Sequence, residues 1–207
     1  APETLAALRA AFRRRGRTAR FEFFEAFAPA LPAALRAGGF SEEARQWSML
    51  CRPPDLRPVP PVPGLEVREL SPASPSAELR GFALAQRQGF NPQDATQPSQ
   101  ADEDELRRNL LDNGWQAYLA RLDGEPAGAA LCFPPIGGIC EVAGVATRAP
   151  FRRRGIASHL TWLATRNAFA NGAQTACLTA EDERAGQVYR RIGYQPFSVM
   201  LAYIDPF

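Results

Sequence analysis

The sequence contains no lysine: all 24 of its basic residues are arginine. This absence excludes enzymes whose chemistry needs a lysine, such as nucleotide hydrolases with a Walker A loop, Schiff-base enzymes and Ser-Lys hydrolases. The net charge of +2 is also too small to favour a protein that binds nucleic acid or a polybasic site on a membrane. We therefore expect neither nucleic acid nor a membrane among the partners.

Histidine and cysteine are scarce as well. The chain has one histidine, His159, and its four cysteines form no Cys-x-x-Cys pair: Cys51, Cys132, Cys140 and Cys177. This pattern argues against a zinc site and against a disulfide framework, so we expect no metal and reduced thiols. A lone histidine also gives little support to a Ser-His-Asp or Cys-His enzyme, and we expect His159 to be structural.

Long apolar runs are missing too. No stretch approaches the roughly 20 apolar residues that span a bilayer. The arginines between Arg9 and Arg15 interrupt the only segment near the start that could resemble the core of a signal peptide. Together with reduced thiols, these absences predict a cytoplasmic protein.

Proline, by contrast, is concentrated in one place. Six prolines between Pro53 and Gly64 remove backbone donors and prevent a helix or a central strand, so an extended linker is expected there. The linker predicts three parts: an N-terminal unit at residues 1–52, the Pro-rich linker at 53–64 and a larger domain at 65–207.

The larger domain has the pattern of an α/β fold around a mixed sheet. Asp123-Gly124 predicts a tight turn between two antiparallel strands. Apolar periodicity predicts helices at 77–90, with Leu79, Phe82, Ala83 and Phe90 on one face, from about 102, at 156–172 and from 182 to 193. It predicts strands at 65–70, 115–122, 126–133, 139–147, 175–179 and 198–204.

The N-terminal unit has the order helix, strand, helix, strand. Subtracting 154 from the numbering lays the helix at 156 onto residues 2–16, the strand at 174–180 onto 20–26, Gly193-Tyr194 onto Gly39-Phe40 and the last strand onto 44–51. We interpret the unit as a degenerate half-copy of the larger domain; a chance match of element order is the alternative. Because half a domain cannot bury its own faces, we expect it to pack against a sheet of the same subunit or of a homodimer partner.

A basic turn carries the first functional signal. The segment Arg152-Arg153-Arg154-Gly155-Ile156-Ala157 follows the strand end Val145-Ala146-Thr147 and precedes a helix. Gly155 can adopt conformations closed to other residues, and Ala157 is small enough to let an anion approach the backbone. Backbone N–H groups at the helix N-terminus then point at a phosphate, and Ser158 can add a hydroxyl. An ordinary solvated basic turn is the alternative.

A second signal lies near the C-terminus, where Asp182 and Ala185 lead to Tyr189 and then to Gly193-Tyr194. Together with the basic turn, these residues resemble the GCN5-related N-acetyltransferase family, whose motifs are (Gln/Arg)-x-x-Gly-x-(Gly/Ala) and Asn-x-x-Ala-x-x-x-Tyr. The resemblance covers residues 65–204. It departs at Asp182, where the family has asparagine; Asp182 can still cap the helix.

The resemblance implies a mostly antiparallel sheet flanked by helices, with acetyl-CoA as the acyl donor. It implies that Tyr189 protonates the departing thiolate, a suitable task for a phenol that stays protonated at neutral pH. Glu141, eleven residues before Arg152, resembles the glutamate base of some family members; a surface carboxylate is the alternative. The residues that would contact the donor are Val145, Ala146, Thr147, Arg152, Arg153, Arg154, Gly155, Ile156, Ala157 and Ser158.

The expected function is acetyl transfer from acetyl-CoA to a primary amine. The alternatives are a non-catalytic acyl-CoA-binding or regulatory module and, more distantly, a protein that only makes interactions. The acceptor stays open among a polyamine, an amino acid, a peptide terminus and an antibiotic. Under the half-copy hypothesis, Leu35 stands where Tyr189 would be and Ala1 where Gly155 would be, so the N-terminal unit is expected to be catalytically empty.

Overall fold

The computed structural model describes residues 2–206, which form two compact units. Unit 1 combines the described parts of residues 1–49 and 196–207 with residues 179–186, and unit 2 combines residues 50–178 and 187–195. Neither unit is one continuous stretch of chain, because the C-terminal strand belongs with the N-terminal segment. The domain boundary expected at the Pro-rich segment stays a prediction.

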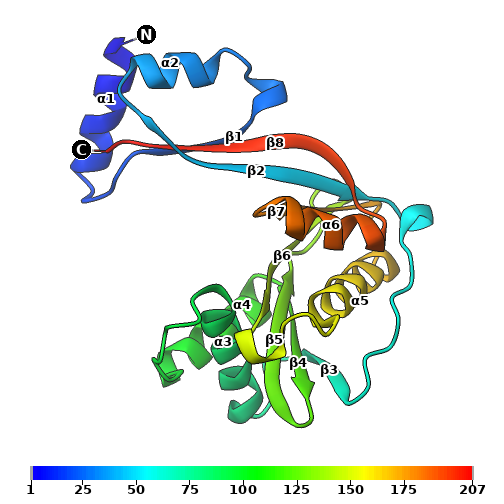
Figure 1. Ribbon diagram of the computed structural model, residues 1–207. Coiled ribbons are helices and arrows are strands. Elements are labelled where there is room, and N and C mark those ends of the chain that lie inside the picture. The colour runs from blue at the N-terminus through cyan, green and yellow to red at the C-terminus, as the bar shows by residue number, and fades with distance from the viewer. Residues whose placement is uncertain (1, 207) are drawn as a thin grey trace. The chain divides into compact units, whose positions relative to one another are not determined.

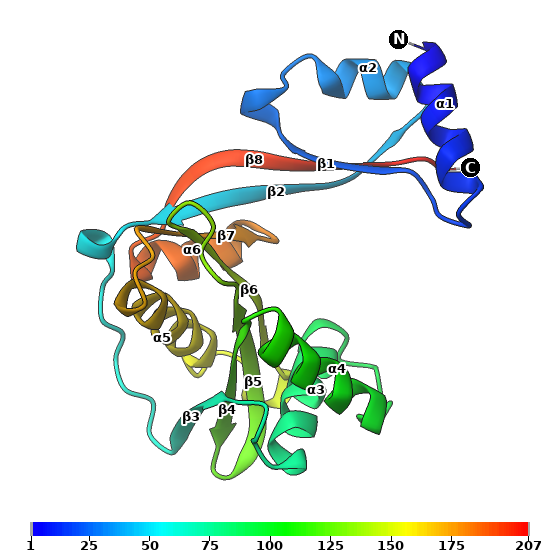
Figure 2. The same cartoon turned by 180° about the vertical axis from the view of Figure 1, so that it is seen from behind.

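Unit 2 is built on five strands in the order β7-β6-β5-β4-β3. The pairs from β3 to β6 are antiparallel, and β6 pairs with β7 in parallel, as the predicted mixed α/β fold requires. Helices α3 and α4 lie on one face of this sheet and α5 on the other (Figures 1 and 2). The elements are β3 (Leu65–Leu70), α3 (Ser76–Phe90), α4 (Gln100–Asp112), β4 (Gln116–Leu122), β5 (Glu125–Cys132), β6 (Ile139–Thr147) and α5 (Ile156–Ala170), while β7 (Thr175–Ala180) and α6 (Glu183–Ile192) each contribute residues to both units.

The helix α3 packs by one apolar face. Leu79, Phe82 and Ala85 are buried against side chains of α4, β4 and β5, which removes their apolar area from water. Phe90, predicted for this face, is instead 61% exposed. The end of α3 lies too close to β6 for a large side chain: a Cβ added at Gly89 would be 2.6 Å from the Cβ of Ala146, so glycine faces the sheet and Phe90 turns outward.

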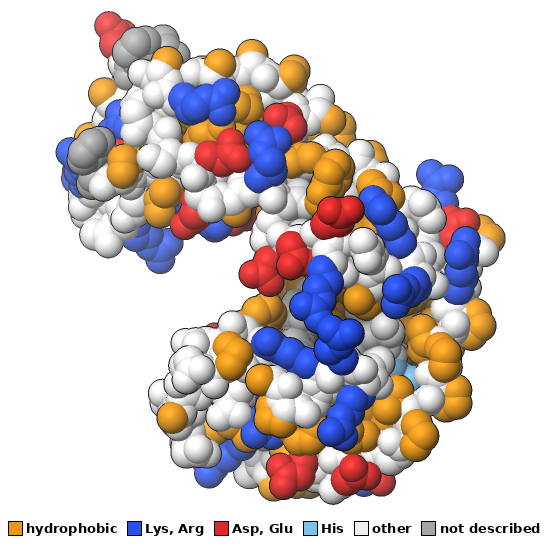
Figure 3. Space-filling model, viewed as in Figure 1, with side chains coloured by type: hydrophobic (Ala, Val, Ile, Leu, Met, Phe, Trp, Pro, Cys, Tyr) orange, Lys and Arg blue, Asp and Glu red, His pale blue; other side chains and the backbone are white. Residues whose placement is uncertain are grey.

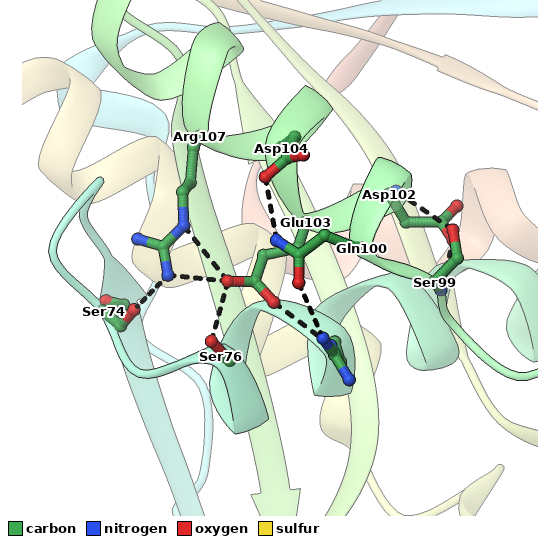
Figure 4. A network of polar contacts seen from close by, with 9 residues as sticks. Ser74, Ser76, Ser99, Gln100, Asp102, Glu103, Asp104 and Arg107 are labelled. Carbon is green, nitrogen blue, oxygen red and sulfur yellow. Dashed lines mark hydrogen bonds and ion pairs between the residues drawn. The ribbon is translucent and has the colours of Figure 1, made fainter.

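The helices α3 and α4 are joined by a buried carboxylate (Figure 4). Glu103 on α4 is 2% exposed and accepts hydrogen bonds from Ser76 Oγ at 2.7 Å, Arg80 Nε at 3.1 Å and Arg107 Nη2 at 2.8 Å. These donors favour the ionised form, first of all Arg107, and lower the pKa of Glu103 to about 2. The capping box of Ser99 and Asp102 begins the same helix.

Unit 1 has the strand order β1-β8-β2, with β1 antiparallel to β8 from Arg20↔Ile204 to Phe24↔Met200. The predicted order of helix, strand, helix, strand is observed, and the segment packs on a strand of its own chain. Its core is formed by Ala19, Leu35, Phe40, Leu201 and Tyr203. The elements are α1 (Pro2–Arg13), β1 (Arg20–Phe24), α2 (Leu31–Ala37), β2 (Ser41–Cys51) and β8 (Gln195–Ile204).

No helix within residues 2–206 combines the length and the apolar character needed to cross a membrane. Among the same residues, no three His, Cys, Asp or Glu side chains are grouped so as to hold a metal ion. Cys51, Cys132 and Cys140 are buried free thiols, and Cys177 is partly exposed.

Candidate active site

The site begins where β6 and β7 part. Their parallel pairing runs through Ile139↔Thr175, Cys140↔Ala176 and Glu141↔Cys177 and ends there. β6 continues to Thr147, held on its other edge by β5. Within the described chain, the second half of β6 therefore presents one backbone edge without a neighbouring strand. Such an edge can pair with an extended ligand as if the ligand were an added strand.

A bulge accompanies the parting of the strands. The register between β5 and β6 shifts between Ala129 and Leu131, and Gly144 has a φ of +57°. Gln86 on α3 donates from Nε2 to the carbonyl of Gly144 at 2.6 Å. Bulges bend the strand that carries them and often lie beside functional sites. Here α3 fixes the bulge that leads into the segment Val145 to Thr147, which the family resemblance predicts to contact the donor.

A tight turn then connects β6 to α5. Arg153 and Gly155 have φ values of +65° and +82°, and Gly155 is the residue that caps α5. The first backbone N–H groups of a helix have no intrahelical acceptor, so those of Ile156, Ala157 and Ser158 face the space before the helix. Aligned N–H groups and the positive end of the helix dipole suit an anion such as a pyrophosphate.

The three arginines of the turn have different environments. Arg152 donates from Nε to the carbonyl of Thr147 at 3.1 Å and from Nη2 to that of Gly89 at 2.8 Å, so it ties the turn to β6 and α3. Arg153 and Arg154 are exposed and form no ion pair with a described residue. Basic side chains gather on the face that carries α5 and its turn (Figure 3). Arg153 and Arg154 can therefore attract a polyanionic donor, while Arg152 also positions the turn, and its contact with the donor stays a prediction.

Two buried polar atoms near the turn lack protein partners. Thr147 Oγ1, at the end of β6, and His159 Nδ1, on the first turn of α5, make no hydrogen bond to a described residue. A buried hydroxyl without a partner costs free energy, which a bound ligand with polar groups would recover. The unpaired edge, the turn and Thr147 therefore fit the donor implied by the sequence. Burial lowers the pKa of His159, and its ring packs edge-on against Trp162.

The two predicted catalytic residues both lie in unit 2. Tyr189, on α6, is 9% exposed, and its ring centroid is 6.2 Å from that of Tyr194. The hydroxyl of Tyr194 shares a 2.6 Å hydrogen bond with Thr165, which braces the aromatic pair against α5. Glu141 is exposed on β6 and stands in the last pair before the strands part, opposite Cys177.

Two further residues, Asp182 and Cys177, have roles that follow from their surroundings. Asp182 accepts a 2.7 Å hydrogen bond from the N–H of Ala185, so it caps α6 as predicted. Cys177 is the partly exposed thiol of the site. Burial, and secondarily the charge of Glu141, raise its pKa to about 11, so it stays protonated at neutral pH and is a poor nucleophile.

Diverging strands, a basic turn that leads into α5 and a tyrosine on α6 are together the arrangement that an acyltransferase acting on a phosphate-bearing donor would need. A profile of the acetyltransferase (GNAT) family matches residues 81–194. The chain belongs to this family of acetyltransferases.

Solved structures agree with this assignment. A GCN5-related N-acetyltransferase from Kribbella flavida is 30% identical, with a TM-score of 0.77, and the match covers 100% of this chain and 75% of that one. One from Sphaerobacter thermophilus is 21% identical, with a TM-score of 0.69 over 91% of this chain and 59% of that one. A tandem GNAT protein from the clavulanic acid biosynthesis pathway shares the fold at 11% identity and a TM-score of 0.70, over 97% and 67%. A search of curated proteins found no match.

Proposed function

We propose that the chain transfers an acetyl group from acetyl-CoA to a primary amine. The observation that carries the proposal is the unpaired edge of β6, which ends in the turn at Gly155. The pantetheine arm pairs with Val145 to Thr147, and the pyrophosphate binds the N–H groups that begin α5. A backbone N–H of the same edge stabilises the negative charge that develops on the thioester oxygen.

In this mechanism the residues of the chain move two protons. Glu141 accepts a proton from the acceptor ammonium, directly or through water, and the amine nitrogen attacks the thioester carbon. The new C–N bond forms as the C–S bond breaks, and Tyr189 gives its proton to the sulfur. The attacking nitrogen then loses its second proton, which passes through water to the Tyr189 phenolate and leaves a neutral amide. The high pKa of Cys177 disfavours an acyl-cysteine intermediate and so favours direct transfer. A cytoplasmic location and a homodimer stay predictions.

A second candidate function is a module that binds acyl-CoA without transferring the acyl group. Asp182 favours it, because a carboxylate stands at the position of the motif's asparagine and is committed to the helix cap. The two functions share the donor site and differ in whether CoA is released.

The test is release of the CoA thiol with a panel of amines, for wild type and Tyr189→Phe. We expect similar acetyl-CoA binding and a rate lower by about 100-fold in the variant, because general acid catalysis contributes that much or more. Tyr118→Phe is the control: this buried tyrosine of β4 is bonded to Asn167 and lies outside the proposed machinery. Tight acetyl-CoA binding with no release for any amine would replace the enzyme by the binding module.

A further inference from the structure

The sheet face under α3 and α4 carries a pocket of about 370 Å³. Its size is near the lower end for small-molecule sites, so it suits a compact ligand rather than a long chain. Its walls are mainly apolar and come from α3, α4, the strand β5 and the residue that precedes β4. The apolar lining includes Phe82, Phe90, Leu106, Trp115 and Leu131.

The charged groups of the pocket leave one net negative charge. Arg87 and Asp102 both line it, but they pair with each other at 2.6 Å, Nη2 to Oδ1. Glu105 also lines it, is exposed, and forms no ion pair with a described residue. The pocket therefore attracts a cation and disfavours a ligand that carries a carboxylate.

Two residues that line the pocket contact β6, the strand that carries Glu141 and the predicted donor-binding segment. Gln86 lines it and bonds to the carbonyl of Gly144, the residue before Val145. Leu131 lines it and pairs with Ala143 on β6. Next along the same face, Phe133 packs against Trp115 at 4.9 Å between ring centroids, and its N–H donates to the carbonyl of Glu141.

Opposite residues of an antiparallel pair share a face of the sheet, so Glu141 lies on the face of the pocket. Glu141 lies on β6, the strand next to that of Leu131, two residues from Ala143, the partner of Leu131. Strand spacing and rise give about 8 Å between the Cα atoms of Leu131 and Glu141. A ligand that fills the pocket with an apolar group can therefore reach Glu141 with a short amine-bearing arm.

We propose that the acceptor is a small arylalkylamine without a carboxylate, whose aromatic body fills this pocket and whose amine extends toward Glu141. The proposal rests on the proposed function and names its substrate class. Aromatic walls contribute stacking and cation–π attraction, and the charge of Glu105 selects an amine over the corresponding amino acid.

The test compares matched acceptors: tryptamine with tryptophan, tyramine with tyrosine, and spermidine as a cation without an aromatic body. We expect wild type to prefer each arylalkylamine in kcat/KM. Phe90→Ala should raise KM for tryptamine about fivefold at nearly unchanged kcat, the loss expected for a half-exposed aromatic contact. Glu105→Gln should reduce the preference over tryptophan about two- to fivefold, as for one exposed charge.

Two control variants match these changes outside the pocket. Leu111→Ala removes a side chain of α4 that is 72% exposed, and Glu125→Gln removes an exposed charge at the start of β5. Neither should alter the preference. If CoA is released but wild type prefers tryptophan or spermidine, or if Phe90→Ala and Glu105→Gln behave like the controls, the substrate class is wrong and the proposed function stands.

A separate readout covers the case in which no amine releases CoA. That result would overturn the proposed function. Calorimetric titration with tryptamine then tests whether the pocket binds an arylalkylamine. Binding that weakens in Phe90→Ala and not in Leu111→Ala supports the pocket as an arylalkylamine site. No binding of tryptamine by wild type overturns it.

Discussion

The helices α6 and α2, from different parts of the chain, end in the same way. At the end of α6 the N–H of Gly193 donates to Arg190 and that of Tyr194 to Tyr189, both at 3.1 Å. Gly193 has a φ of +116°, and Tyr194, the residue before β8, is fully buried. This is the Schellman pattern, in which glycine in a left-handed conformation stops a helix.

At the end of α2 the N–H of Gly39 donates to Arg36 and that of Phe40 to Leu35, both at 2.9 Å. Gly39 has a φ of +82°, and Phe40 is buried. The four positions are those paired by the shift of 154 residues, so the cap supports the proposed half-copy, which stays a prediction. The difference is chemical: buried Leu35 stands where α6 has Tyr189. The two regions share the rules for ending a helix, and unit 2 alone carries the proposed proton donor; Ala1, the expected counterpart of Gly155, lies outside the described residues.

The largest difference between the two helix ends is expected when Gly193 and Gly39 are each replaced by alanine, in separate variants. A Cβ at Gly193 would be 2.0 Å from the carbonyl oxygen of Asp55, whereas a Cβ at Gly39 would be 3.4 Å from Nη2 of the flexible Arg9 side chain. Both changes incur the left-handed penalty of about 1–2 kcal/mol. Gly193→Ala adds a clash with backbone, for a total of about 3–4 kcal/mol.

The measurement is urea unfolding of both variants, followed by circular dichroism. A free energy of unfolding that falls equally in Gly193→Ala and Gly39→Ala would show that the two helix ends are equivalent in packing as well as in hydrogen bonding. That outcome would contradict the predicted difference in packing between the two helix ends.

The next largest effect concerns the arginines that clamp each unit. Arg9 pairs with Asp205 at 3.0 Å, donates to the carbonyl of Gly38 at 2.7 Å and lies 4.5 Å from the centroid of the Phe40 ring. The Asp205 side chain is 3% exposed, so Arg9→Ala leaves a buried charge without its partner. We expect a loss of about 2–3 kcal/mol in the free energy of unfolding, somewhat less than for a fully buried pair.

Arg152→Ala is the matched change in unit 2. It removes an exposed side chain that bonds to two carbonyls, so we expect a loss of about 1 kcal/mol in stability and weaker acetyl-CoA binding. Urea unfolding and calorimetric titration with acetyl-CoA measure the two effects. If Arg9→Ala weakens acetyl-CoA binding more than Arg152→Ala does, the assignment of the donor site to the turn is wrong.

Local signals in the sequence predicted much of unit 2. The bounds of β3 and β6 agree with the prediction, because alternating apolar residues end at turn residues in both cases. Asp123 and Gly124 both have positive φ values, as the predicted tight turn requires. The cap by Asp182 was also predictable, since its partner is three residues away.

Contacts between distant residues could not be predicted in this way. The contact of Arg152 with the donor stays a prediction, and nothing in its sequence neighbourhood signals that it also donates to the carbonyl of Gly89, 63 positions away. The bond from Gln86 to Gly144 spans 58 positions. The outward turn of Phe90 depends on how closely α3 approaches β6, which is a property of packing and not of helical periodicity.

The smallest expected effect is a difference in acid sensitivity between the units. Glu103 in unit 2 has a folded pKa of about 2 against an ordinary 4.5. Its contribution to stability is therefore complete above pH 4.5 and is lost as the pH falls from 4.5 toward 2. Glu42 in unit 1 has a pKa lowered by hydrogen bonds first from Arg45 and then from Tyr203, but its side chain is 31% exposed against 3% for Glu103.

We therefore expect Glu103→Gln to lower the melting temperature at pH 7 more than Glu42→Gln does. The Glu103→Gln curve should approach wild type as the pH falls through 4.5, because wild-type Glu103 becomes protonated in the unfolded state and loses its advantage. Melting temperatures from pH 7 to pH 3 test this. A constant gap between Glu103→Gln and wild type across that range would mean that the clamp between α3 and α4 depends on shape and hydrogen bonding rather than on the charge of Glu103.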